Sequence, residues 1–232
     1  MPWPGALPDG WLGVPAGTSI GGHQVLIAHP ENHRLPATFI PGSPGIDVAA
    51  AEQAAAALLT AIGVSDGSEA ADRTPARMVA GLAELLNCPA WEFTTFPNRE
   101  GQHELVLARD VPFTSLCAHH LLPFSGVAHV GVLPAARIAG LSKLARAVEA
   151  FAARMQVQEE LGQQIAAFLE ERLECRGVGV VLAAEHLCMT RRGVRAQGAE
   201  TVTIACRGDL RDDPGARAEF LQLAAPQTRR AA

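Results

Sequence analysis

The stretch SLCAHHLLPFSGVAHVGVLP, residues 115–134, decides the fold. Its second half, from Gly126 to Leu133, is a run of β-branched and small apolar residues that predicts a buried strand. Upstream, residues 104–114 alternate with a period of two, interrupted by a predicted turn at Arg109–Asp110, which indicates a second strand. The polar segment from Ser115 to His120 is therefore expected at the end of a strand.

On the C-terminal side, helical periodicity runs from Leu141 to about Glu174. A break near Met155–Gln156 predicts two long helices in place of one. Residues 177–184 and 201–206 are rich in β-branched and small apolar side chains, and they predict two more strands.

On the N-terminal side, residues 47–62 predict an amphipathic helix, with Gly63 as its C-terminal stop. A second helix is predicted from Pro75 to Leu86, with Asp72 near its start as a capping residue. Residues 1–46 hold half of the 16 prolines, and we expect a flexible or surface-draped arm there.

The order of helices, two strands, two helices and two strands has no regular strand–helix alternation. It favours an α+β fold with an antiparallel sheet over a doubly wound α/β fold. We expect three parts: the arm at 1–46, an N-terminal helical segment at 47–90 and a catalytic domain at 91–232.

The composition excludes several classes of protein. With 48% hydrophobic and 19% charged residues, the 232-residue chain is too apolar to be disordered, and no apolar run is long enough to span a membrane. The net charge of −5 gives no general attraction for nucleic acid or anionic membranes. The N-terminus does not resemble a secretory signal, so we expect a cytoplasmic protein.

Three residues offer metal ligands. Cys117 and His120 stand three residues apart, and Cys188 follows later in the chain. Two thiolates and an imidazole suit zinc and leave one tetrahedral position open, as in catalytic sites. The alternative is two buried thiols with a hydrogen-bonded histidine. His119 and His186, each close to a possible ligand, favour the metal, whereas Cys88, Cys175 and Cys206 are expected to be small core residues.

A substrate site is indicated by charged residues near these segments. Lys143 and Arg146 follow Ser142 at the start of a predicted helix, and Arg192 follows Cys188; together they could hold a polyphosphate or simply be solvated. Glu159 stands at a helix junction, where a carboxylate can accept N1–H and the exocyclic amine of guanine, or face solvent.

These stretches together resemble the GTP cyclohydrolase I family, zinc enzymes that convert GTP to dihydroneopterin triphosphate. The similarity runs in one colinear order and covers about two thirds of the chain. Its segments are DRTPAR at 72–77, SLCAHHLLPFSGVAHVGVLP at 115–134, GLSKLARAVEAFAARMQVQEELGQQI at 140–165, HLCMTRRGV at 186–194 and AEFL at 218–221. The resemblance implies the tunnelling fold, an antiparallel sheet backed by two long helices, and a toroidal homodecamer with active sites at subunit boundaries.

The resemblance also implies roles for particular residues. Cys117, His120 and Cys188 match the zinc ligands, and His119 and His186 match the proton-transfer histidines. Glu159 matches the guanine-binding carboxylate, with Gln158 beside it in the pocket. Ser142, Lys143, Arg146 and Arg192 match positions on the ribose and triphosphate side, and Arg77 matches a possible contribution from a neighbouring subunit.

Two positions depart from the family pattern. Ala118 stands where the family has glutamate, and Glu160 stands where it has arginine. The first change removes an acidic group between a metal ligand and the proton-transfer pair. It keeps open two alternatives to full turnover: a paralogue that only binds a purine nucleotide or pterin, and an enzyme that stops at a ring-opened formamide or feeds a deazapurine product.

Overall fold

The computed structural model describes residues 39–40, 45–64 and 67–225. Nearly all of the predicted arm at 1–46 lies outside these residues. The elements are β1 (Phe39–Ile40), α1 (Val48–Ala61), α2 (Glu69–Leu86), β2 (Trp91–Glu92), β3 (Thr95–Pro97), β4 (Val106–Cys117), β5 (Pro123–Leu133), β6 (Arg137–Ala139), α3 (Leu141–Ala152), β7 (Met155–Gln156), α4 (Gln158–Leu173), β8 (Gly177–His186), α5 (Leu187–Thr190), β9 (Thr201–Gly208), α6 (Asp209–Asp212) and α7 (Pro214–Ala224). None of the helices in this described part is long and apolar enough to cross a membrane.

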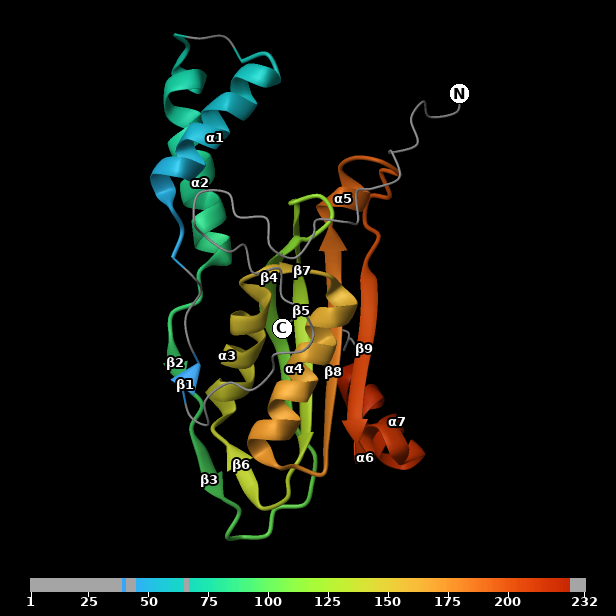
Figure 1. Cartoon of the computed structure of the whole chain (residues 1–232). Coiled ribbons are helices and arrows are strands. Elements are labelled where there is room, and N and C mark those ends of the chain that lie inside the picture. Colours follow the sequence, from blue (N-terminus) through green and yellow to red (C-terminus); the bar gives the residue numbers. More distant parts are fainter. Residues whose placement is uncertain (1–38, 41–44, 65–66, 226–232) are drawn as a thin grey trace, which may run out of the picture. The chain divides into compact units, whose positions relative to one another are not determined.

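A five-stranded sheet forms the centre, in the order β7-β4-β5-β8-β9 (Figure 1). Every neighbouring pair is antiparallel except β4 and the two-residue β7, which are parallel. The order of the main elements confirms the predicted α+β fold.

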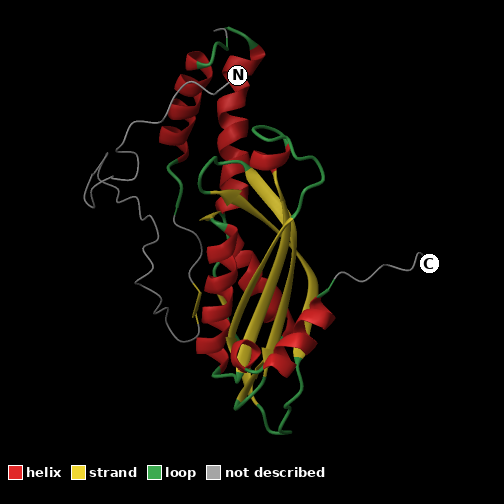
Figure 2. Cartoon of the chain, turned by 90° about the vertical axis from the view of Figure 1, so that its right-hand side faces the viewer, coloured by secondary structure: helices red, strands yellow, loops and turns green. Residues whose placement is uncertain are grey.

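Helices α3 and α4 cover one face of the sheet, as Figures 1 and 2 show. The predicted break between them is confirmed, because β7 interrupts the helical backbone at Met155–Gln156. Apolar side chains of both helices, among them Val148, Leu161 and Ile165, are fully buried against sheet residues such as Val130 and Val180. This core fixes α4 against the strands that carry the candidate site.

The start of α2 corrects a prediction. The helix begins at Glu69 and not at Pro75, because Ser68 is the N-cap and its side chain accepts a hydrogen bond from the Ala71 amide at 3.1 Å. Acidic Glu69 and Asp72 in the first turn also suit the positive end of the helix dipole. Pro75 is accommodated inside the helix, at the cost of one amide donor.

The predicted turn at Arg109–Asp110 is wrong as well. β4 is one continuous strand with a β-bulge, in which Arg109 and Asp110 face the single residue His129 of β5. Asp110 adopts a positive φ of 53°, and its amide donates to Nδ1 of buried His129 at 3.3 Å. His129 therefore accepts a hydrogen bond from the Asp110 amide, which the bulge removes from the regular hydrogen bonding between β4 and β5.

This contact predicts a loss of stability in acid. Burial lowers the pKa of His129; the Asp110 carboxylate opposes this shift and Arg109 adds to it. The unfolded chain therefore binds a proton more readily, so the free energy of unfolding should fall as the pH drops below about 6.5. In urea unfolding at fixed protein concentration, His129→Gln, which keeps an acceptor, should flatten this dependence. His103→Gln, at an exposed loop position, should leave it unchanged; equal slopes in all three proteins would contradict the assignment.

Helices α6 and α7 pack on the opposite face of the sheet and were not predicted. Phe220 of α7 lies over Gly131 of β5 and Gly179 of β8, where an added Cβ would meet the ring at 2.7 and 2.5 Å. The start of α7 does carry a recognisable signal, since Asp213 accepts from the Gly215 amide at 2.7 Å and Pro214 follows the cap.

Candidate metal centre and adjoining cavity

A tight turn after β4 brings two of the predicted ligands together. The amides of His120 and Leu121 both donate to the Cys117 carbonyl, at 3.2 and 2.8 Å, and the Cys117 amide donates to Leu122 at 2.9 Å. Leu121 has a positive φ of 53°, which closes the turn. As a result Nδ1 of His120 lies 3.7 Å from Sγ of Cys117.

The third ligand comes from the end of β8. Strand pairing sets Phe124, near the start of β5, opposite His186 at the end of β8. The short helix α5 follows and carries Cys188. The ligand atoms of Cys117, His120 and Cys188 then lie within 4.8 Å of one another.

The donor set fits zinc. With bond lengths of about 2.3 Å to sulfur and 2.0 Å to nitrogen, ligand atoms of a tetrahedral site lie about 3.5–3.8 Å apart. The distance of 3.7 Å between Sγ of Cys117 and Nδ1 of His120 agrees with this, and all three ligand atoms lie within 4.8 Å of one another. Burial raises the pKa of the Cys188 thiol, Cys117 raises it further and Arg192 opposes the rise. A cation would supply the positive charge that two neighbouring thiolates require.

A cavity of about 260 Å³ adjoins these ligands. Predicted site residues from three separate segments line it together: Cys117, His119, His120, Gln158, Glu159, His186 and Cys188. Gln156, Val157, Met189 and Thr201 complete the lining. Titratable groups, an acidic side chain and a possible metal therefore meet in one concave site, which is the usual arrangement of an active site.

His186 is held on two sides. Its ring stacks on Phe124 with centroids 4.5 Å apart and an angle of 3° between the planes. Nε2 of His186 lies 2.6 Å from Oε1 of Gln158. Burial lowers the pKa of His186, and Glu159 partly offsets this shift. The stacking partner Phe124 was not predicted, because only the pairing of β5 with β8 reveals it.

The other predicted site residues lie elsewhere in the chain. Ser142, Lys143 and Arg146 are in α3, where Nζ of Lys143 donates to the Glu92 carbonyl at 2.7 Å. Arg77, in α2, pairs with Glu69 at 3.7 Å. None of these four residues lines the cavity beside the ligand cluster.

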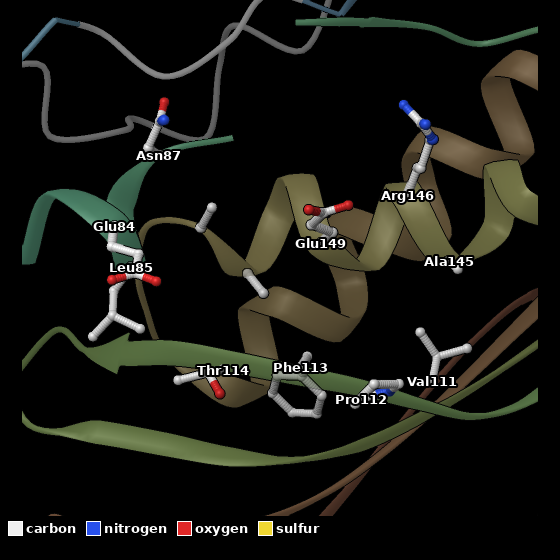
Figure 3. A pocket seen from close by; sticks show the side chains of 12 residues that line it. Glu84, Leu85, Asn87, Val111, Pro112, Phe113, Thr114, Ala145, Arg146 and Glu149 are labelled. Carbon is white, nitrogen blue, oxygen red and sulfur yellow. The ribbon is translucent and has the colours of Figure 1, made fainter. Parts of the chain in front are cut away.

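Arg146 lines a second cavity of about 430 Å³ between the end of α2, β4 and α3. Figure 3 shows Arg146 and Glu149 along α3, with Pro112 and Phe113 on the strand below them. Within one chain, Ser142, Lys143, Arg146 and Arg77 therefore lie away from the cavity beside the ligand cluster, whereas Arg192 is close enough to Cys188 to influence its pKa.

Of the remaining cysteines, Cys88 is buried in the main core, as predicted. Cys175 and Cys206 are only partly buried: Cys175 packs against the main core and Cys206 against the smaller cluster under α7. Burial raises the pKa of Cys175 to about 11, as expected for an inert thiol.

The sequence of this chain is similar to that of a known protein family. The sequence model of GTP cyclohydrolase I matches residues 51–225. A GTP cyclohydrolase 1 from Dehalococcoides mccartyi is 43% identical over 182 residues, which cover 76% of this chain and 96% of the relative. One from Thermobifida fusca is 49% identical, covering 77% and 89%, and one from Mycolicibacterium gilvum is 46% identical, covering 83% and 97%. The chain therefore belongs to the GTP cyclohydrolase I family.

Proposed function

We propose that this chain is a zinc-dependent GTP cyclohydrolase I. It would hydrolyse GTP at C8, release formate and rearrange the product to 7,8-dihydroneopterin triphosphate, in a cytoplasmic route to folate or another pterin. The observation that carries the proposal is the convergence of Cys117, His120 and Cys188 on a cavity that also holds two histidines and a glutamate. The names of the relatives support the same activity.

Cys117, His120 and Cys188 would hold the zinc beside the cavity that they line. When bound, zinc lowers the pKa of a coordinated water to about 7 and acts as a Lewis acid. His186 and His119 would move protons between the purine, the ribose and solvent, since an imidazole ring can both accept and donate a proton.

Glu159 would select guanine. Its carboxylate lines the cavity from the first turn of α4 and can accept from both N1–H and the 2-amino group. Adenine offers no such pair of donors, so binding it would leave the carboxylate without partners.

The triphosphate would be held across a subunit boundary. We propose a homo-oligomer, a toroidal decamer, in which Ser142, Lys143, Arg146 and Arg77 of one chain complete the cavity of another, while Arg192 acts beside its own Cys188. Two open sheet edges support assembly: among described residues β9 pairs only with β8, and β7 covers only the last two residues of β4. Val202 and Ile204 on that β9 edge are 56% and 45% exposed, which is unusual for a sheet edge in a monomer.

The direct test is incubation of purified protein with GTP. Mass analysis should show loss of formate, and fluorescence after oxidation should show a pterin. Absence of both products, with GTP bound, would favour the binding-only paralogue; a stable formamide would favour an enzyme that stops after ring opening. Ala118 is the feature that favours these alternatives.

Glu159→Gln should weaken GTP binding by about 5–150-fold, equivalent to about 1–3 kcal/mol, because one acceptor becomes a donor that faces the donors of guanine. The Michaelis constant for GTP measures the effect. Glu160→Gln is the matched control, since Glu160 is in the same helical turn but does not line the cavity. Equal behaviour of the two variants would refute the role of Glu159.

A further inference from the structure

We infer that Gln158 is a positioning residue, which holds His186 as the Nε2–H tautomer and leaves Nδ1 as the nitrogen that can meet a substrate. The tautomer follows from contacts within the chain. Only the last step, the contact of Nδ1 with the substrate, depends on the proposed function.

The orientation of the Gln158 amide is set by its surroundings. Gln158 is the first residue of α4 and is 1% exposed. Its Nε2 lies 3.2 Å from the Leu182 carbonyl and 2.9 Å from the Thr201 carbonyl. Carbonyl oxygens only accept hydrogen bonds, so the amide nitrogen must face them. The reversed amide would oppose oxygen to oxygen, at the cost of two buried hydrogen bonds.

Thr203 adds a third partner to this nitrogen, with Oγ1 at 3.2 Å. Thr201 and Thr203 of β9 and the Leu182 carbonyl of β8 therefore surround the amide nitrogen of Gln158. Its amide oxygen, Oε1, is directed at His186. Oε1 is an acceptor without a proton, so Nε2 of His186, at 2.6 Å, must be the donor. In the neutral ring the proton is on Nε2, and Nδ1 carries the lone pair.

Nδ1 is thus the nitrogen available for chemistry. Within residues 45–64 and 67–225, it makes no hydrogen bond, and the stacked Phe124 ring restrains the imidazole plane. His186 lines the 260 Å³ cavity, so a substrate there can meet its free nitrogen.

This assignment changes the predicted role of Gln158. The resemblance placed it among the substrate-binding residues, but both ends of its amide are used by the protein. Its replacement should therefore affect the rate of the step that His186 performs more than the binding of GTP.

The tautomer can be measured without substrate. Zinc-loaded protein labelled with ¹⁵N at histidine is studied by magic-angle-spinning NMR at alkaline pH, where the imidazoles are neutral, and the His186 signals are assigned by their loss in His186→Asn. We expect a protonated Nε2 and a bare Nδ1 in the unmodified protein. Gln158→Met, or the shorter Gln158→Asn, should give a mixture of tautomers.

The matched control is Gln156→Met. Gln156 is also buried and lines the same cavity, but its amide bonds the Phe151 carbonyl at 2.8 Å and Gln164 at 3.0 Å, not His186. This variant should keep the Nε2–H tautomer. A protonated Nδ1 in the unmodified protein, or an unchanged His186 spectrum in both folded Gln158 variants, would overturn the inference.

Kinetics supply an independent readout. Gln158→Met should lower kcat for C8 hydrolysis by about 10–100-fold and change the Michaelis constant for GTP by less than about 3-fold. A raised Michaelis constant with unchanged kcat would show direct substrate binding and overturn the inference. If the unmodified protein does not convert GTP, the proposed function fails, whereas the NMR result still decides the tautomer.

Discussion

Replacement of Cys117 or Cys188 by serine is expected to remove bound zinc and GTP hydrolysis together. A serine hydroxyl is a poor zinc ligand, and two remaining protein ligands are fewer than zinc sites in proteins normally use. Loss of a hydrogen-bond partner of a ligand already lowers metal affinity by about 10–100-fold. Loss of the ligand itself should therefore lower the affinity for zinc by a larger factor. Metal content by mass spectrometry and pterin formation, measured on the same preparation, check the result.

Cys206→Ser is the matched control. Cys206 is partly buried on β9 and lies outside the ligand cluster, so its variant loses a thiol but should keep one zinc per chain. Full zinc occupancy in both Cys117→Ser and Cys188→Ser would show that the ligands are misassigned. Loss of zinc in all three variants would indicate a general defect in folding.

The sequence predicts the main elements well because each carries a local signal. The alternating strands, the helical periodicity of α3 and α4 and the break at Met155–Gln156 all depend on neighbouring residues. The missed elements show the limit of such signals. The bulge at Asp110 depends on a buried histidine in the next strand, and the start of α2 depends on a serine cap four residues before Asp72.

Some features of the candidate site are also local in sequence, and others are not. Cys117 and His120 share one turn, so their spacing already indicates a pair of ligands. Cys188 was predicted as the third ligand from its chemistry and from the family resemblance. The partners of Gln158 could not be predicted, because Thr201 and Thr203 are 43 and 45 residues away and are positioned by the register of β9 on β8. The stacking of Phe124 on His186 likewise depends on the register of β5 and β8.

Ala118→Glu is expected to raise the rate of pterin formation more than the rate of C8 hydrolysis. Ala118 lies between the ligand Cys117 and the cavity residue His119, whose Nδ1 is 3.9 Å from Sγ of Cys117. Residue 118 is exposed, and its amide donates to the Gln156 carbonyl at 3.0 Å, so a longer side chain can be added without disturbing this contact.

The physical reason is the placement of a carboxylate beside His119. Such a group orients an imidazole and raises its basicity, and one well-placed acid–base or orienting group is worth about 10²–10⁴-fold. Ribose opening and ring closure require several proton transfers, whereas hydrolysis at C8 would use His186 and the three residues that would hold zinc, none of which is residue 118. Separate assays of the formamide and the pterin would resolve the two rates. Ala118→Gln, similar in size but uncharged, should bring little gain. If the unmodified protein forms pterin without accumulating formamide, and Ala118→Glu is no faster, then a carboxylate at this position is dispensable and the later proton transfers are carried by the histidines alone.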